Sequence, residues 1–566
     1  MYTSSLSSLQ RCNLVAWQDV VAEKRRRQKA AIPNEWLIPP IEQGRTNVLD
    51  IPISCGLLSP QEAEITTTSD VYLLLGKLAR GEWSAVDVTT AFCKRAVIAH
   101  QLTNCLTEIF IEEAIQRANE LDDFYKKNAT VVGPLHGLPI SLKDQFRVKG
   151  HEASMGYVAW LGQVAEDDSA LVKLLRQSGA VFYVKTNVPQ TLMWGETHNN
   201  VFGRTCNPHN LAFTPAGSSG GEAALLAFHG SILGVGSDVG GSIRNPSHFC
   251  GVYGFKPSSR RVPTYGIVNS LDGQDAIATI AGPMSTSLSG IKTFMQSVLA
   301  AKPWRVDPDV IFKPWDDAGY ALKEHGEGYK LCFGLIWDDG IVKPHPPVMR
   351  ALECAKRALE NAGHVLIDWV PHKHAELIAN ARSTFLADGG ADYAAALISG
   401  EPMIHSMKLD ADPNDIPEFR KPREPLTAYQ LWQLHKERRE LRKEYFDHWQ
   451  ATEDVTGTGR PVDAIICPVS PYAAVPHGEK RSAVYTLVWN TLDCPSLVLP
   501  VTRADSAIDT QVLPHEFRNL DDQAVYELYD PECFHGLPVG LQVVGYRGEE
   551  EATIAMAELV DAALAT

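Results

Sequence analysis

Short apolar runs that alternate with helical segments constrain the fold of this chain more than any other feature. The runs with the length and composition of strands lie at 138–143, 181–185, 232–236, 330–337, 365–369, 464–467, 497–501 and 539–544. The segments with helical periodicity include 169–179, 222–228, 426–449 and 549–564. Strands that alternate with helices along a chain are typical of an α/β fold. We therefore predict a central mixed β-sheet covered by helices on both faces.

The domain organisation follows from the absence of dividing segments. No low-complexity linker splits the 566 residues, and no repeat recurs at a period of about 20–50 residues. We predict one large domain over 70–566, preceded by a helix-containing N-terminal extension over 1–69 that packs on the core. The charged, proline-containing stretch 410–425 is predicted to be a surface insertion.

Three helices are predicted at the start of the large domain. Ser69 is the expected N-cap of a helix over 70–78, and Ser84 is the expected N-cap of a helix that reaches about residue 100. A third helix is expected over 114–126.

The charge of the chain argues against nucleic acid as a partner. Its formal net charge is −16, whereas nucleic-acid-binding proteins usually present a basic face. The one dense basic run, 24–29, continues the segment 17–23 as one amphipathic helix. We expect its basic residues to form a solvated helix face; a nuclear-localisation patch is the alternative.

Compartment and cofactors are predicted from what the sequence lacks. No segment approaches about 18 consecutive apolar residues, so no membrane span is expected. The N-terminus lacks the pattern of a secretory signal. The 11 cysteines are scattered and contain no CxxC, so neither a metal site nor a disulfide framework is expected. Reduced thiols fit the cytoplasm. We predict no cofactor, and the sequence is compatible with a homodimer without deciding the oligomeric state.

Two clusters of glycine and serine carry the chemistry. They occupy 215–222 and 234–244, and helical or strand segments flank both. Runs of backbone N–H groups in such loops can cradle an anion. The phosphate-binding patterns GxxxxGK[ST] and GxGxxG are absent. An oxyanion needs a nucleophile beside the donors, and Ser242 follows Gly240 and Gly241. The competing explanation is a plain glycine-rich connection between helix and sheet.

Two further residues are candidates for nucleophile and base. Ser219 stands in a GxSxG pattern, but the preceding segment contains two prolines and is predicted to be a loop, whereas a nucleophile elbow needs a strand there. Lys143 ends an apolar strand and is the candidate base for a serine–lysine pair. The alternative for Lys143 is a surface lysine whose stem packs on apolar residues.

The order and spacing of three residues favour the second mechanism. Lys143, Ser218 and Ser242 stand 75 and 24 residues apart, within GLPISLKD, GSSGG and DVGGSIR. This arrangement strongly resembles the amidase signature family, whose members share a Ser–cis-Ser–Lys triad. The resemblance extends from about residue 70 to the end, with later motifs at 463–468 and 536–545.

Within the family, the chain looks like the fungal acetamidase or general amidase branch. The matching pieces lie at 24–36, 101–105 and 133–137. One departure is Ala216, which stands where the family usually has a glycine.

The resemblance implies roles for the triad. Ser242 would be the nucleophile that forms the acyl ester, Ser218 the bridging serine and Lys143 the base. The cis peptide bond would precede Ser218. The pKa of a free lysine is about 10.4, so burial has to lower it before Lys143 can act as a base near pH 7.

The resemblance also implies the surroundings of the triad. The backbone amides of Val239, Gly240, Gly241 and Ser242 would bind the oxyanion and, with Ser218, contact the substrate. Asp238 and Arg244 flank this turn and are expected to form a supporting ion pair or a hydrogen-bonding frame rather than to react. The other two assignments are Ser219, which would support its loop, and Leu192, which would contact substrate on the acyl side; plain core packing is the alternative for Leu192.

The implied activity is hydrolysis of a small carboxylic amide to a carboxylate and ammonia or an amine through an acyl-serine. Three alternatives stay open at this point: an A-type subunit of a tRNA-dependent amidotransferase, an esterase built on Ser219, and a non-catalytic scaffold. A degenerate scaffold should have lost a triad residue, and here all three are present. The sequence does not identify the acyl group or the amine.

Overall fold

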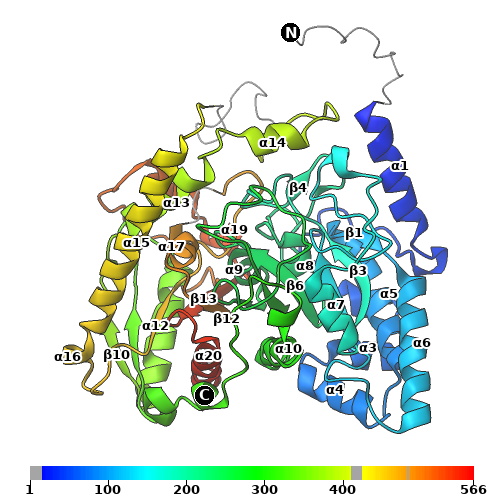
Figure 1. The fold of residues 1–566 in the computed structure, drawn as a ribbon, viewed down its shortest axis with the longest axis horizontal. Helices are drawn as coiled ribbons and strands as arrows, with labels where there is room; N and C mark the ends of the chain where they lie inside the picture. Colours follow the sequence, from blue (N-terminus) through cyan, green and yellow to red (C-terminus); the bar gives the residue numbers. More distant parts are fainter. Residues whose placement is uncertain (1–15, 409–422, 481–483) are drawn as a thin grey trace, which may run out of the picture.

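The fold is built on one large sheet. The computed structural model describes residues 16–408, 423–480 and 484–566. Within these residues, 11 strands form a sheet in the order β1-β3-β2-β6-β8-β7-β12-β13-β11-β9-β10, and β4 and β5 form a small separate ribbon (Figure 1). The strands are β1 (Leu106–Ile109), β2 (Pro139–Lys143), β3 (Val181–Thr186), β4 (His198–Asn199), β5 (Gly203–Arg204), β6 (Leu233–Asp238), β7 (Tyr253–Lys256), β8 (Ile280–Ser285), β9 (Cys332–Leu335), β10 (Val365–Asp368), β11 (Ala464–Pro468), β12 (Ser496–Arg503) and β13 (Pro538–Val544).

The sheet is mixed, as predicted. Strands β3, β2 and β6 run parallel to one another, and so do β10, β9 and β11. The strands between these two groups pair antiparallel. Because parallel neighbours end at the same edge of a sheet, the carboxyl ends of β2 and β6 lie next to each other. Ligands of α/β proteins bind at such an edge.

Twenty α-helices lie among the described residues outside the strands. They are α1 (Trp17–Ala30), α2 (Ile51–Ser54), α3 (Pro60–Thr67), α4 (Val71–Ala79), α5 (Ala85–Thr103), α6 (Ile111–Asn128), α7 (Ala170–Gln177), α8 (Gly220–Ala227), α9 (Arg244–Cys250), α10 (Leu288–Ala300), α11 (Asp317–Tyr320), α12 (Pro346–Asn361), α13 (His374–Phe385), α14 (Ala391–Ala396), α15 (Ala428–Gln450), α16 (Glu453–Thr456), α17 (Val484–Leu492), α18 (Leu520–Leu528), α19 (Pro531–Phe534) and α20 (Glu550–Leu564).

Helices cover both faces of the sheet. Ile466 and Val543 belong to the apolar cluster that contains residues of α12 and α20. Their neighbours Ile465 and Val544 belong to a second cluster, with residues of α13, α15 and α17. Successive strand residues point to opposite faces, so these two groups of helices lie on opposite sides of the sheet (Figure 1). The predicted α/β class with a covered central sheet is confirmed.

Most predicted elements are present, with two kinds of difference. Asp70, rather than Ser69, is the N-cap of α4, because the Asp70 side chain accepts the Leu73 N–H. Ser84 caps α5 as predicted. Strands β1, β7 and β8 were not predicted. Two of them contain residues that usually interrupt strands, Gly254 in β7 and Pro283 in β8, and β1 is only four residues long.

The N-terminal segment packs on the same core as the rest of the chain. Ile32, Val48 and Ile51 are buried in the main apolar cluster. Helix α1 forms as predicted, but its basic face is not wholly solvated. Lys24 is 3% exposed and pairs with Glu108 and with Glu152, because α1 lies against β1. A boundary between residues 69 and 70 stays a prediction.

Two further expectations concern the chain surface. Of the predicted insertion at 410–425, residues 410–422 lie outside the described residues. Among the described residues, no helix combines the length and the apolar character needed to cross a membrane.

Candidate active site

Lys143 lies at the edge where β2 and β6 end. It is the last residue of β2, and its side chain is fully buried. Its Nζ donates to Ser218 Oγ at 2.8 Å, to Ser237 Oγ at 2.8 Å and to the Ser237 carbonyl at 3.4 Å. The structure therefore brings two of the three predicted triad residues into direct contact, although they are 75 residues apart in the chain.

The environment of Lys143 favours the neutral amine. Burial lowers the pKa of Lys143 to about 7, while the carboxylates of Asp238 and Glu222 act in the opposite direction. Burial disfavours a charged amine because the interior solvates the ammonium ion poorly. A base that is half neutral near pH 7 can accept a proton under ordinary conditions.

Ser218 lies on a constrained loop that leads into α8. The Gly217–Ser218 peptide bond is cis, as the family resemblance implied. Ala216 has φ of 62°, in the left-handed region, which accounts for the usual glycine at this place. Its backbone is held on both sides, because its N–H donates to Thr214 Oγ1 at 3.1 Å and its carbonyl accepts from Thr197 Oγ1 at 2.8 Å.

Ser242 lies in the turn that joins β6 to α9. The Ser242 carbonyl accepts the Ser219 N–H at 3.1 Å, which links this turn to the loop that carries Ser218. Ser242 is half-buried, as are Val239 and Gly240. Among the described residues, no hydrogen bond joins the Ser242 hydroxyl to Ser218 directly. The turn is thus the most open part of the site.

The amides of this turn point in two directions. Gly241 N–H donates to Asp238 Oδ1 at 2.8 Å, and Ile243 N–H donates to Asp238 Oδ2 at 3.1 Å. Within the described part of the chain, the amides of Val239, Gly240 and Ser242 donate to no protein group. Gly241 therefore differs from the expectation that all four amides face a substrate, because a buried carboxylate already accepts from it.

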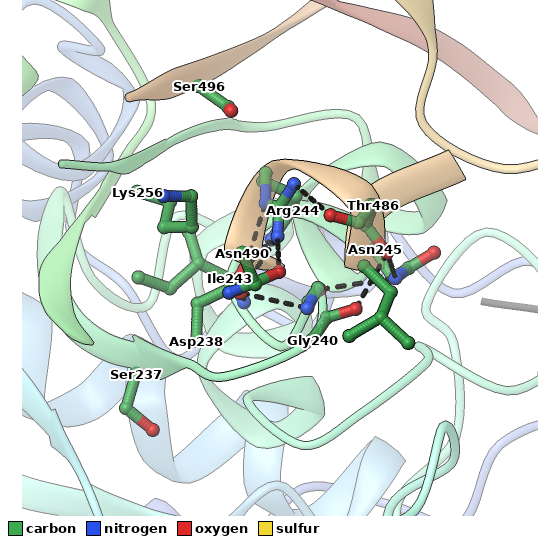
Figure 2. Close-up of polar contacts among 12 residues, drawn as sticks. Ser237, Asp238, Gly240, Ile243, Arg244, Asn245, Lys256, Thr486, Asn490 and Ser496 are labelled. Atoms are coloured by element: carbon green, nitrogen blue, oxygen red, sulfur yellow. Dashed lines mark hydrogen bonds and ion pairs between the residues drawn. The ribbon is translucent and has the colours of Figure 1, made fainter. Parts of the chain in front are cut away.

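Asp238 and Arg244 form the predicted ion pair. Both side chains are fully buried, and Arg244 donates to the two Asp238 oxygens at 2.9 and 3.0 Å (Figure 2). Burial by itself would raise the pKa of Asp238, but Arg244 holds that pKa well below its usual range. The Asp238–Arg244 ion pair thus links the two ends of the turn that bears Ser242.

Helix α17 contacts this turn through Thr486 and Asn490, as Figure 2 shows. Asn490 Nδ2 donates to Asp238 Oδ1 at 2.9 Å, and Arg244 donates to the Thr486 carbonyl at 2.9 Å. The Thr486 hydroxyl donates to the Gly240 carbonyl at 2.7 Å. Gly241 has φ of 130°, and a Cβ there would overlap Thr486 and Asn245, so only glycine fits the turn.

Glu222 lies on α8, close enough to Lys143 for its charge to influence the pKa of that lysine. It is fully buried, and it accepts hydrogen bonds from Ser141 Oγ and, at 2.7 Å, from Thr186 Oγ1. Burial raises its pKa to about 7, against the two hydrogen bonds and the charge of Lys143. A Cβ at Gly234 would overlap Glu222, so this glycine serves close packing rather than anion binding.

Leu192 lies in a small apolar cluster beside the loop of Ser218. It is 5% exposed and packs with Met155, Tyr157 and Val188. A Cβ at Gly217 would lie 2.7 Å from the Trp194 carbonyl, so the segment that follows Leu192 touches that loop. A role for Leu192 in substrate contact stays a prediction.

Ser219 is tied to the backbone of β6. Its hydroxyl donates to the Ser237 carbonyl at 3.3 Å and accepts the Ser237 N–H at 3.4 Å. The segment from 205 to 219 contains no strand, so the strand–turn–helix of a nucleophile elbow is absent from this described stretch. The geometry gives no support to an esterase built on Ser219.

Several residues of the site, Glu222 among them, carried no assignment from the sequence. Ser237 lies in the second glycine–serine cluster, and Gln145 lies two residues after Lys143. Because β2 and β6 pair in parallel, their carboxyl ends lie together, and a prediction of this pairing would have indicated both residues. Thr486 and Asn490 lie more than 240 residues further along the chain, in a segment without a recognisable motif. Only the tertiary structure brings α17 to the turn.

A buried lysine in contact with one serine, next to a turn that bears a second serine, defines the class of serine–lysine hydrolases. The family model described as Amidase matches residues 87–554. The chain belongs to the amidase family and is an amide-hydrolysing enzyme.

Individual relatives agree with this assignment. The chain is 44% identical to an acetamidase of Aspergillus oryzae over 549 residues, which cover 96% of this chain and 98% of the relative. It is equally similar to an acetamidase of Emericella nidulans, at 44% identity over 554 residues. A solved structure of fatty acid amide hydrolase, 33% identical, superposes with a TM-score of 0.88 over 97% of this chain and 95% of that protein.

Proposed function

We propose that this enzyme hydrolyses a small carboxylic amide by a Ser242–Ser218–Lys143 relay. The observation that carries the proposal is the 2.8 Å contact between the buried Lys143 Nζ and Ser218 Oγ. The turn that bears Ser242 is hydrogen-bonded to the same loop through the Ser219 N–H.

The proton path follows from these contacts. Neutral Lys143 takes the proton of Ser218, Ser218 takes that of Ser242, and Ser242 Oγ attacks the amide carbonyl carbon. The proton then returns along the same path to the leaving nitrogen, which departs as ammonia or an amine. Water hydrolyses the acyl ester in a second step that regenerates Ser242.

The oxyanion would be bound by backbone amides. We assign this role to Val239, Gly240 and Ser242, whose N–H groups have no partner among the described residues. The role implied for Gly241 becomes indirect, because its amide donates to Asp238 and so holds the shape of the turn. Removal of one oxyanion donor typically costs a factor of about 10²–10³ in rate.

The substrate we propose is a short aliphatic amide such as acetamide. The similarity to two acetamidases over nearly the whole chain supports this choice. The test is ammonia release from acetamide, longer aliphatic amides and benzamide, together with amine release from anilides. A preference that rises steadily with acyl length would contradict it.

A serine-directed fluorophosphonate tests the relay itself. We expect peptide mapping to find the adduct on Ser242, Ser242→Ala to abolish labelling, and Ser218→Ala to slow it by at least about a hundredfold because the proton path is broken. Ser219→Ala is the matched control and should have a mild effect. An adduct on Ser219, with Ser242→Ala still active, would overturn the relay.

The compartment and the assembly are further proposals. The ten cysteines within the described residues are free thiols, which supports a reducing compartment such as the cytoplasm. A homodimer stays a prediction, to be tested by sedimentation.

A further inference from the structure

Lys143 has a second hydroxyl partner that the relay does not use. Ser237 Oγ lies 2.8 Å from Lys143 Nζ, the same distance as Ser218 Oγ. The Ser237 hydroxyl also contacts Gln145 Oε1, and Gln145 Nε2 donates to the Val268 carbonyl at 3.1 Å. Ser237 is 3% exposed and Gln145 is fully buried. The four groups form one hydrogen-bonded row that ends at the base.

The donor and acceptor of each bond in this row are determined by its far end. A carbonyl oxygen can only accept, so the amide nitrogen of Gln145 must face Val268. The backbone repeats this contact, because Val268 N–H donates to the Gln145 carbonyl at 3.0 Å. Gln145 Oε1 then faces Ser237 and can only accept, so the Ser237 hydroxyl hydrogen is committed to Gln145.

This direction restricts what Lys143 can do. Ser237 has no hydrogen left to donate, so both its hydroxyl and its carbonyl, 3.4 Å from Nζ, accept from the amine. A neutral amine has two hydrogens and one lone pair. When both hydrogens bind Ser237, the lone pair is left for the third neighbour, Ser218 Oγ.

We propose that Gln145, acting through Ser237, is a positioning residue that aims the lone pair of Lys143 at the Ser218 hydroxyl. The inference rests on the proposed function, in which Lys143 is the base. In the step concerned, the lone pair forms an N–H bond with the Ser218 proton. Ser218 Oγ takes the Ser242 proton, and Ser242 Oγ bonds to the carbonyl carbon as the carbonyl electrons move to oxygen.

The loss of the row has a characteristic effect on the pH profile. Without Gln145 as acceptor, the Ser237 hydroxyl can rotate and donate to the lone pair, which hides the base and stabilises the neutral amine. The charged groups that act on Lys143, Asp238 from β6 and Glu222 from α8, stay in place. The activity should therefore fall while its midpoint moves to lower pH. If a substitution only loosened the packing, water would enter the pocket and solvate the ammonium form of Lys143. The midpoint of the activity would then move to higher pH.

The experiment measures the second-order rate of fluorophosphonate labelling of Ser242 against pH in the full-length enzyme. The variants are Gln145→Met, which keeps chain length but has no amide, Ser237→Ala, Ser237→Thr and the double variant. Ser285→Ala is the control, because Ser285 is a fully buried serine on the adjacent strand β8 that donates to a backbone carbonyl and does not contact Lys143. Near-ultraviolet circular dichroism verifies the fold of each variant.

We expect Gln145→Met and Ser237→Ala each to lower the plateau rate by about tenfold, which is only part of the factor of about 10²–10⁴ that general-base catalysis supplies as a whole. Both should shift the midpoint to lower pH, Gln145→Met because the Ser237 hydroxyl can then donate to the amine, and Ser237→Ala because the ammonium form loses an acceptor. The double variant should be no slower than the worse single variant, because both changes break one row. Ser237→Thr should restore rate and midpoint, and Ser285→Ala should resemble the wild type.

Two kinds of result would overturn the inference. A wild-type rate and midpoint in Gln145→Met, or a midpoint that moves to higher pH in that variant and in Ser237→Ala, would show that the row only packs the site. Lys143→Ala separates this failure from that of the proposed function. Suppose that one of these two results is obtained. If Lys143→Ala is then labelled at the wild-type rate, both the relay and the inference are wrong. If Lys143→Ala is not labelled, only the inference is wrong.

Discussion

Acid should switch off the acylation step, because Lys143 has to be neutral to accept the Ser218 proton. The pKa of Lys143 is lowered from 10.5 to about 7 by burial. Because the pKa is lowered, the amine is neutral above about pH 7 and becomes protonated as the pH falls through about 7. We therefore expect the logarithm of kcat/KM to rise by about one per pH unit up to pH 7 and to level off above it.

The size of the effect follows from the same two values. At about 1.36 kcal/mol per pKa unit, the fall from 10.5 to about 7 corresponds to roughly 5 kcal/mol of differential solvation. About half of Lys143 is then neutral at pH 7, against roughly 0.03% of an ordinary lysine. Burial thus increases the amount of active base on the order of a thousandfold.

The assay is ammonia release from an amide without titratable groups, measured at low substrate concentration between pH 5 and 10. Under these conditions kcat/KM reports the ionisation of the free enzyme. A burst experiment establishes that acylation, and not deacylation or product release, limits the rate.

A second variant separates Lys143 from its neighbour. The pKa of Glu222 is raised to about 7, so the wild-type midpoint belongs to the two groups together. Glu222→Gln removes a charge that favours the ammonium form, and the midpoint should move to lower pH. A flat profile with chemistry rate-limiting, or a midpoint near 10.5, would refute the assignment of Lys143 as a buried base.

Two further predictions concern stability. Because folding removes the proton of Lys143 between about pH 7 and 10.5, wild-type stability should rise with pH across that window. Lys143→Met should accordingly exceed the wild type by about 2–3 kcal/mol in urea unfolding at pH 7, less than the full solvation cost because Ser218 and Ser237 lose a partner; equal stability at pH 7 would contradict this. Arg244→Met leaves Asp238 buried and unpaired and should lower the free energy of unfolding by about 3–5 kcal/mol. Its control, Arg439→Met, removes an exposed ion pair and should change it by less than about 1 kcal/mol; similar losses in both variants would be inconsistent with the buried pair.

The fold class and the core of the site could be predicted from local pattern. Strand β2 and helix α8 lie within a residue or two of their predicted positions, because apolar runs and caps act over a few residues. Lys143, Ser218 and Ser242 stand out because glycine and serine cluster around two of them. The cis bond before Ser218 came from the family resemblance, and residue patterns alone did not indicate it.

The short and interrupted strands could not be predicted in this way. Strand β8 contains Gly282 and Pro283, yet it pairs along its whole length with β6. The neighbours of a strand in the sheet stabilise it even where its own residues disfavour extended structure. Likewise, Lys24 lies in a basic run that resembles a solvated face, but the carboxylates of Glu108 and Glu152 hold it in the interior.

The sequence by itself determined which chemical groups this enzyme has: a lysine at the end of a strand, serines in two glycine-rich loops, and an aspartate and an arginine beside one of them. The tertiary structure decided how those groups behave. Burial beneath the sheet edge, and not the identity of the residue, lowers the pKa of Lys143. The partners that orient the site, Gln145, Thr486 and Asn490, are ordinary residues in sequence. They matter because hydrogen bonds act over about 3 Å in space, whatever the separation along the chain.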